Sequence, residues 1–123
     1  MIDHIGIQVS DLERSIAFYT KALAPLGFEL VMRWEQFAGF GIAGKPEFWI
    51  DGRSAPKDPI HVAFRASGRA IVRGFHDAAI AAGGKDNGPP GVRPHYHEHY
   101  YGAFVHDPDG HNVEAVCHEA FLD

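Results

Sequence analysis

The order of apolar and polar residues predicts a strand followed by a helix near the start of the chain, and then predicts the same pair again. Residues 2–9 are mostly apolar and β-branched, with one histidine, His4, among them. Apolar and polar side chains alternate around a second histidine, His61, as expected of another strand. His61 follows His4 by 57 positions, and Gly84 follows Gly27 by the same interval. The chain is therefore expected to contain an internal repeat.

The first helix is predicted directly after the first strand. Ser10 is expected to cap it, with Glu13 completing a capping box. Pro25 and Gly27 are expected to stop it near Ala24. The apolar positions that recur at helical spacing and predict its buried face are Leu12, Ile16, Tyr19 and Leu23.

Three further strands complete the first half, at residues 28–33, 35–42 and 47–50. Residues 51–59 contain glycine and prolines without any periodicity, which is typical of a connector. We therefore expect one domain over residues 1–123, in which module one covers residues 1–56 and module two covers residues 57–123.

The second half repeats this order. Ser67 and Gly68 are expected to open a helix that Gly83 and Gly84 end. Its predicted apolar face consists of Ile71, Phe75, Ala78 and Ala82. Two strands are predicted at the end of the chain, with a tight turn between them; the strands cover residues 101–106 and 112–117, and the turn is Asp107-Pro-Asp-Gly110. Both halves thus read as βαβββ units, which predicts an α+β fold.

The second half is also longer than the first. The interval from His61 to Glu114 is 53 positions, whereas the interval from His4 to Glu47 is 43. The surplus falls in a glycine- and proline-rich run and the histidine- and tyrosine-rich residues after it, which we expect to form a loop. Insertions in repeats often lie on the binding face, so this loop is a candidate for function.

Composition narrows the class of protein. The chain is 46% hydrophobic and 22% charged, with a net charge of −5 and a pI near 5.9, as in a globular domain without the basic surface of nucleic-acid binders. No apolar run is long enough to span a membrane, and the N-terminus lacks a signal-peptide pattern. A single cysteine, Cys117, excludes an internal disulfide and favours a reducing compartment, so we expect a cytoplasmic protein. Strand alternation places Cys117 in the core.

Four polar residues lie within otherwise hydrophobic strands and form the candidate metal site. They are His4, Glu47, His61 and Glu114, at the first or last strand of each half. Two imidazoles with one or two carboxylates are the ligands that a divalent first-row metal prefers. For each histidine taken alone, a half-buried ring bonded to a backbone carbonyl is the alternative interpretation, and Glu47 could instead be a solvated residue at the start of its strand.

Several stretches resemble one family. They are the opening Asp3-His-Ile-Gly-Ile-Gln-Val-Ser-Asp-Leu-Glu-Arg-Ser-Ile-Ala-Phe-Tyr19, the strand His61-Val-Ala-Phe64 and the closing Asp107-Pro-Asp-Gly-His-Asn-Val-Glu114. Together with the double βαβββ pattern they resemble the vicinal oxygen chelate superfamily of glyoxalases, bleomycin resistance proteins and extradiol dioxygenases. The resemblance covers nearly the whole chain and implies a cupped mixed sheet around a central cavity, with the helices outside.

The resemblance also implies a site and a mechanism. His4, His61 and Glu114 match the family's metal ligands, and Glu47 stands where glyoxalase I has a fourth ligand. A divalent metal (nickel, zinc, cobalt, manganese or iron) would chelate two adjacent oxygens of a small substrate and stabilise an enediolate-type intermediate. Either Glu114 or Glu47 would then be the catalytic base of a lyase or isomerase.

Two features depart from glyoxalase I. Gln8 stands where that enzyme has an arginine for glutathione, and the stretch from His95 to Tyr101 has no counterpart that we recognise. This stretch could line the cavity, bind a metal, or be an exposed loop without function. The residues assigned to the substrate pocket are Trp49, His97, His99 and Tyr101; for Trp49, core or dimer packing is the alternative.

Three functions remain open at this point. The first is the metal-dependent lyase or isomerase, the second an iron(II) ring-cleaving dioxygenase without Glu47, and the third a metal-free protein that binds and sequesters a drug. We expect a homodimer with a small-molecule substrate, and neither nucleic acid nor membrane as a partner. The two modules could pair within one chain or between two chains.

Overall fold

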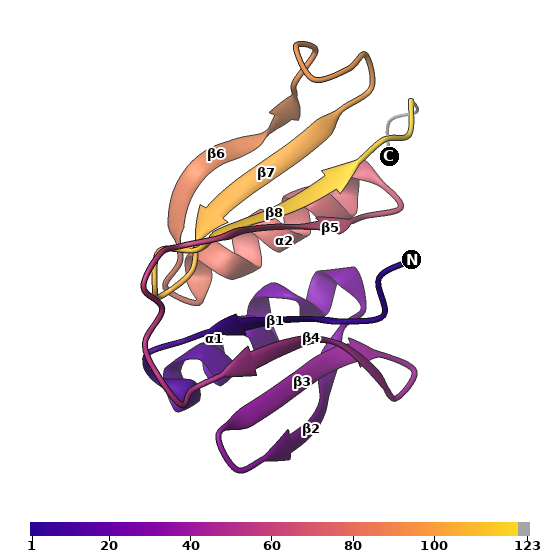
Figure 1. Cartoon of the computed structure of the whole chain (residues 1–123). Helices are drawn as coiled ribbons and strands as arrows, with labels where there is room; N and C mark the ends of the chain where they lie inside the picture. Colours follow the sequence, from indigo (N-terminus) through magenta and orange to yellow (C-terminus); the bar gives the residue numbers. More distant parts are fainter. Residues whose placement is uncertain (121–123) are drawn as a thin grey trace.

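The computed structural model describes residues 1–120, which form two modules of the same architecture (Figure 1). The elements of module one are β1 (Ile5–Gln8), α1 (Leu12–Ala22), the 3-10 helix η1 (Ala24–Leu26), β2 (Glu29–Trp34), β3 (Phe37–Ile42) and β4 (Lys45–Asp51). The elements of module two are β5 (His61–Arg65), α2 (Arg69–Ala81), β6 (Lys85–Val92), β7 (Tyr101–His106) and β8 (Asn112–Cys117). The predicted α+β fold of two βαβββ modules is confirmed.

Each module contains one four-stranded mixed sheet. The strand order is β1-β4-β3-β2 in the first and β5-β8-β7-β6 in the second. In both sheets the first strand pairs in parallel with the last, and the remaining pairs are antiparallel. The crossover that a parallel pair needs is supplied by the helix and the two strands between.

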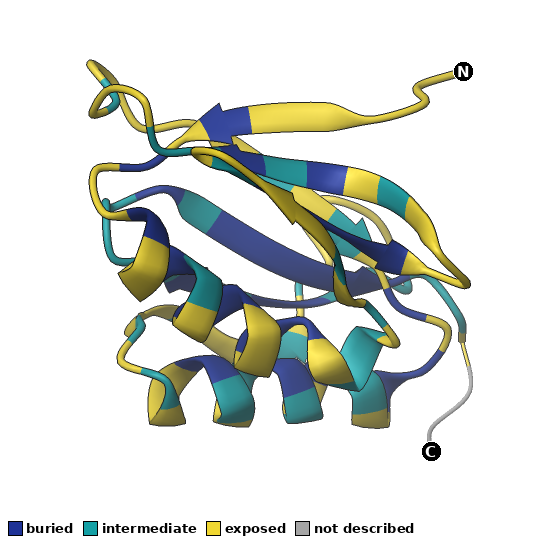
Figure 2. Ribbon diagram, turned by 90° about the horizontal axis from the view of Figure 1, so that it is seen from below, coloured by how far each residue is buried: buried dark blue, intermediate teal, exposed yellow. Residues whose placement is uncertain are grey.

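Both helices cover the same side of the sheets, as Figure 2 shows from below. Alternation along the strands sends one set of side chains, among them Phe40 and Phe48, into the core beneath the helices. The helices contribute the other large buried side chains, which belong to Phe18, Tyr19 and Phe75. Cys117 is fully buried in this core, as predicted. The opposite side, which we call the open face, carries no helix and is therefore where a ligand could enter. Within residues 1–120 neither helix has the length and apolar character that a membrane span requires.

The boundaries of the helices differ from the predictions in two respects. Asp11, not Ser10, caps α1, because its carboxylate accepts the Arg14 amide at 3.1 Å. Gly68 caps α2 as expected, but the buried apolar face of α2 contains Val72, Phe75 and Ala79 and is thus one position out of phase with the predicted one. The predicted side is half-buried, because it packs against the short helix η1 and not against the sheet. A Cβ on Gly74, on this side, would be 3.4 Å from Pro25 of η1.

The glycine- and proline-rich run was expected to be a loop, and this prediction is wrong. It forms most of β6, the outermost strand of the second sheet. Pro89 and Pro90 have no N–H to donate, and the pairing with β7 skips from Gly88 to Gly91 to accommodate them. An edge position tolerates such an interruption because only one side of the strand is paired.

The predicted tight turn between β7 and β8 is present, and it also joins the two modules. The Tyr19 hydroxyl of module one donates to the Asp107 carboxylate at 2.5 Å, and burial together with this carboxylate raises the pKa of Tyr19. The Ser10 amide donates to Asp109 at 3.1 Å. His111, with 1% of its surface exposed, accepts the Ile60 amide through Nδ1 at 3.0 Å.

Because His111 Nδ1 is an acceptor, Nε2 of the neutral ring carries the proton and donates to the Gln8 carbonyl at 2.8 Å. One buried imidazole therefore joins the end of β1 to the residue before β5. We call this contact zone the seam. The edge strands β1 and β5 face each other across it and run in opposite directions (Figure 1).

Candidate functional site

Module one presents His4 and Glu47 on its open face. β1 pairs in parallel with β4, and Ile5 is the partner of Phe48. The residues one position earlier in the chain, His4 before Ile5 and Glu47 before Phe48, are therefore neighbours. Phe48 is buried in the core, so alternation directs Glu47 to the opposite side. The strands thus place one imidazole and one carboxylate side by side on the surface that no helix covers.

The His4 ring is already oriented by its neighbour. Its Nδ1 lies 2.7 Å from the Asp3 carboxylate, which can only accept, so Nδ1 carries the proton and Nε2 is left with a free lone pair. Asp3 is in turn held by Lys45 at 3.2 Å. The hydrogen bond from His4, followed by the contact with Lys45, lowers the pKa of Asp3. A carboxylate on one ring nitrogen is the usual support of a histidine that binds a metal through the other nitrogen.

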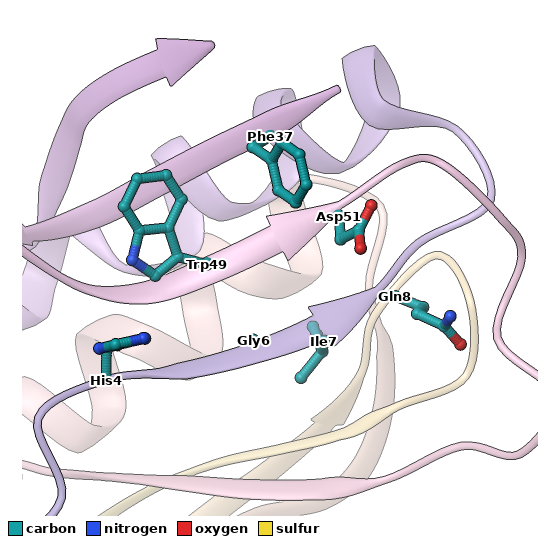
Figure 3. A pocket seen from close by; sticks show the side chains of 7 residues that line it. All are labelled: His4, Gly6, Ile7, Gln8, Phe37, Trp49 and Asp51. Atoms are coloured by element: carbon teal, nitrogen blue, oxygen red, sulfur yellow. The ribbon is translucent and has the colours of Figure 1, made fainter. Parts of the chain in front are cut away.

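A cavity of about 380 Å³ adjoins His4 on this face (Figure 3). It is lined by His4, Gly6, Ile7, Gln8, Phe37, Trp49 and Asp51. The Trp49 ring lies flat on the sheet because Gly39 has no side chain; a Cβ there would be 3.0 Å from the ring. The cavity therefore has a flat floor of glycine backbone and aromatic walls, which suits an apolar part of a small ligand.

The end of the cavity away from His4 is polar, and its two charged side chains, Asp51 and Arg53, pair with each other. Arg53 donates to both oxygens of Asp51, at 3.1 Å and 2.9 Å, and this pairing lowers the pKa of the Asp51 carboxyl. The same guanidinium lies over the Phe37 ring, 4.7 Å from its centroid. Gln8 donates to the Ser54 hydroxyl at 3.2 Å. Arg53 is thus already paired with a carboxylate, and this end of the cavity offers an incoming anion only a neutralised charge.

Module two presents His61 and Glu114 on its open face. β5 pairs with β8 so that Ala63 stands beside Glu114, and His61 Nε2 reaches the Glu114 Oε1 at 2.7 Å. Glu114 is only 1% exposed, whereas the His61 side chain is half exposed. A carboxylate is costly to bury without partners, and His61 provides one for Glu114. The two side chains already point at each other, so a cation could bind both in place of the hydrogen bond between them.

The second oxygen of Glu114 is held by Tyr100. The Tyr100 hydroxyl donates to Glu114 Oε2, and burial followed by this hydrogen bond raises the pKa of Tyr100. Tyr100 belongs to residues 93–100, which connect β6 to β7 and which we call the β6–β7 segment. The ring of Tyr96 packs against Tyr100 with 4.8 Å between centroids. Tyr100, the last residue of this segment, thus covers Glu114 on the open face of module two.

The predicted pocket residues of module two lie at different places. His97 is on the β6–β7 segment and forms a hydrogen bond with His118, with 2.6 Å between the two ring nitrogens. His99 donates its backbone amide to His97 at 3.3 Å. Tyr101 pairs with Cys117 and therefore faces the helices, where Arg69 lies over its ring at 4.9 Å. Trp49 is the one of the four that lines the cavity of module one.

A single chain does not bring the four predicted metal ligands together. Among residues 1–120, no three histidine, cysteine, aspartate or glutamate side chains are placed to hold one ion. His111 fixes the start of β5, and hence His61, beside Gln8 at the far end of β1. His4 is four residues from Gln8, about 13 Å along an extended strand. The chain therefore carries two separate pairs, each with one histidine and one glutamate, and we call these pairs the half-sites of the candidate metal site.

Three contacts around the half-sites and the cavity were not predicted from the sequence. Asp3 supports His4, Asp51 with Arg53 closes one end of the cavity, and Tyr100 binds Glu114. The adjacency of Asp3 and His4 was a usable signal, because neighbouring residues of an irregular terminus can hydrogen-bond. Nothing in the sequence indicated that the Tyr100 hydroxyl meets a carboxylate 14 residues away.

Comparison with known proteins identifies the family. The sequence model of the Glyoxalase/Bleomycin resistance protein/Dioxygenase superfamily matches residues 1–115. A glyoxalase/bleomycin resistance protein from Albidiferax ferrireducens is 28% identical, with a TM-score of 0.81 over 97% of this chain and 99% of that one. A glyoxalase I mutant from Zea mays is 26% identical, with a TM-score of 0.70 over 94% of this chain and 46% of that one.

A lactoylglutathione lyase from Agrobacterium tumefaciens, at 19% identity and a TM-score of 0.69 over 95% of this chain and 92% of that one, shares the fold. No curated protein matches the sequence. The family match spans both modules and both half-sites. The chain therefore belongs to the Glyoxalase/Bleomycin resistance protein/Dioxygenase superfamily.

Proposed function

We propose that this protein is a divalent-metal-dependent lyase or isomerase that acts as a homodimer on a small substrate with two adjacent oxygens. The observation that carries the proposal is the pair of half-sites. Each contains one histidine and one glutamate at repeat-related positions of the open face, and one chain keeps them apart. His4 and Glu47 of one chain would complete the site with His61 and Glu114 of a second chain.

The donor chemistry fits such a metal. Two imidazoles and two carboxylates suit nickel, zinc, cobalt, manganese or iron, and His4 already has its Nδ1 bound to a supporting carboxylate. The bound metal would act as a Lewis acid toward the substrate oxygens. One of the two glutamates would remove a proton from the carbon beside a carbonyl and return it to the neighbouring carbon, so no oxidant is needed.

Exposed apolar side chains support a partner on the open face. Trp34 is 61% exposed and stacks on Phe37, and Met32, on the same strand, is also exposed. Apolar surface of this kind is more often covered by a partner or a ligand than left in water. We further propose that the enzyme works in the cytoplasm, because its one cysteine is a buried free thiol.

Metal titration of chelator-stripped protein tests the proposal. Wild type is expected to bind about one ion per chain, and His61→Ala is expected to bind none. Loss of binding in Glu47→Ala as well favours glyoxalase-like chemistry, whereas retained binding favours the three-ligand iron(II) dioxygenase. Absence of binding in wild type would overturn the metal-dependent functions.

Mixing two variants tests whether the site is shared between chains. His4→Ala and His61→Ala each destroy one half-site, so neither variant should bind metal alone. Random exchange of subunits in a mixture makes half of the dimers mixed, and each mixed dimer contains one intact site, which restores about one quarter of the wild-type metal content. Pairing of the modules within one chain predicts no restoration.

A second function is favoured by the cavity of module one. Its aromatic walls and volume of about 380 Å³ would bind an apolar ligand without any metal, as expected of a drug-sequestering protein. In that case a ligand would raise the thermal midpoint of unfolding equally with and without chelator. A chelator-sensitive shift supports the enzyme.

A further inference from the structure

Two glycines give the cavity of module one a flat floor beside its central tryptophan. In the register of the sheet, Trp49 stands between Gly6 on β1 and Gly39 on β3. The indole ring covers Gly39, because a Cβ there would lie 3.0 Å from two atoms of the ring. Gly6 lines the cavity, whose lining residues follow β1 from His4 to Gln8 (Figure 3). Glycine backbone next to an indole leaves room for a planar group to lie close to the sheet.

An ion pair closes the end of this cavity that lies away from His4. Asp51 is the partner of Gln8 on one side and of Phe37 on the other, and cross-strand partners share one face of a sheet. Arg53 donates to the Asp51 carboxylate through Nε at 3.1 Å, through Nη2 at 2.9 Å and through its backbone amide at 2.9 Å. The side-chain hydrogen bonds lower the pKa of Asp51 and raise the pKa of Arg53, so both groups stay charged at neutral pH.

Each member of this pair occupies the place of an external ion. The Arg53 guanidinium lies over the Phe37 ring, 4.7 Å from its centroid, where a ligand cation would otherwise bind between ring and carboxylate. The Asp51 carboxylate in turn accepts the hydrogen bonds that Arg53 would otherwise give to a ligand anion. A charged ligand group would therefore lose its hydration here without gaining an unpaired counter-charge. An uncharged group loses less hydration, and the Gln8 amide is a polar partner for it.

We propose that Asp51 and Arg53 form a specificity-determining pair, through which the cavity of module one selects an uncharged planar group and rejects the acidic and basic counterparts of that group. The inference deepens the proposed function, because the planar group would belong to the substrate whose oxygens meet the metal at the His4 end. The binding of this group involves only the cavity, so its selectivity can be measured on protein without metal.

Three probes of nearly the same shape test the selectivity of wild type. Benzamide, benzoate and benzamidinium share one ring and differ in the charge of the attached group. Each is titrated into chelator-stripped, isotope-labelled protein, and the indole N–H signal of Trp49, assigned by comparison with Trp34→Phe, reports binding in the cavity. Benzamide is expected to bind about tenfold more tightly than either ion, because neither ion finds an unpaired counter-charge. Equal affinities, preference for an ion, or an unchanged Trp49 signal with all three probes would overturn the proposal.

Two substitutions test whether the pair sets this selectivity. Asp51→Asn frees the guanidinium and should shift the preference about tenfold towards benzoate, whereas Arg53→Gln frees the carboxylate and should shift it about tenfold towards benzamidinium. Glu13→Gln breaks the Arg33–Glu13 pair, which does not line the cavity, and this matched control should bind the three probes like wild type. A preference for benzamide that persists in both Asp51→Asn and Arg53→Gln would overturn the role of the pair.

Failure of this inference and failure of the proposed function give different results. Wild type that binds metal but shows no preference among the three probes overturns the selectivity alone. Wild type that binds no metal but prefers benzamide refutes the proposed function alone, and the cavity then selects the ligand of a binding protein.

Discussion

The open faces of the two modules have the same strand arrangement but differ in how far their histidine and glutamate side chains are buried and bound. In module one the candidate ligands His4 and Glu47 are exposed, and His4 lines a cavity with aromatic walls. In module two Glu114 is buried, and both of its oxygens are bound, one by His61 and the other by Tyr100 of the β6–β7 segment. The repeat therefore preserves where the strands place a histidine and a glutamate, while the connections between strands decide how firmly each is held.

The turns between the last two strands differ in the same way. In module two the turn before β8 reaches across the seam and binds module one through Asp107, Asp109 and His111. The corresponding turn of module one, at Ala43 and Gly44, is short, and a Cβ on Gly44 would meet nothing within 4 Å. The turn of module two thus holds the two modules together, whereas the turn of module one makes no comparable contact. Four substitutions test this difference between the modules.

The largest expected effect is the loss of the seam. His111→Ala leaves the Gln8 carbonyl and the Ile60 amide without a partner and opens a cavity, so we expect a loss of about 3 kcal/mol in the free energy of unfolding. Urea denaturation followed by circular dichroism measures it. His95→Ala, an exposed histidine, is the control and should change stability by less than about 0.5 kcal/mol. Equal effects of the two variants would refute the role of His111.

The next effect concerns the other buried contact across the seam. Tyr19→Phe removes the donor to Asp107 and leaves a buried carboxylate with fewer partners, at an expected cost of about 2 kcal/mol. The Asp107 carboxylate still accepts the His111 and Asp109 amides at 2.9 Å, so the turn should keep its shape. Thermal unfolding measures the loss, and an unchanged midpoint would show that the hydroxyl contributes nothing.

A smaller effect should appear at the β6–β7 segment. Gly102→Ala places a methyl group 3.1 Å from Tyr100 and is expected to displace that ring, weakening cobalt binding about tenfold. The double variant with Tyr100→Phe should lose no more than Tyr100→Phe alone, because both changes act through one hydrogen bond. Additive losses would show that Gly102 acts on Glu114 independently of Tyr100.

The smallest expected effect is in the turn of module one. Ala43 and Gly44 have φ values of 53° and 77°, a left-handed pair that favours asparagine followed by glycine. Ala43→Asn should therefore stabilise the protein by about 0.5 kcal/mol without affecting metal binding. A loss of stability would mean that a feature other than backbone conformation determines the choice of residue there.

The sequence predicted the repeat, the strand that carries His61, and the turn before β8, because these depend on alternation and on turn-forming residues. The first strand is shorter than predicted, because β1 begins at Ile5 and His4 precedes it. It did not predict β6, since Pro89 and Pro90 disrupt the usual strand pattern and only their edge position makes them acceptable. The phase of α2 was also wrong, because two overlapping apolar stripes share Phe75 and only the contact with η1 distinguishes them.

The candidate site shows the same limit. Strand alternation places each histidine and glutamate on the open face, but it contains no information on how the modules join. The separation of His4 from His61 follows from one buried imidazole, His111, which connects the Gln8 end of β1 to β5. The role of Tyr100 depends on the path of the β6–β7 segment, and periodicity does not describe irregular segments.

Because the half-sites are separated along the seam, the fraction of chains that hold a metal ion would depend on the protein concentration. If each metal ion needs residues of two chains, occupancy depends on the dimerisation equilibrium as well as on the metal. Dilution below the dimer dissociation constant would then release the ion even from fully folded chains. A cell that lowers the amount of this protein would switch off each remaining copy as well as reduce their number.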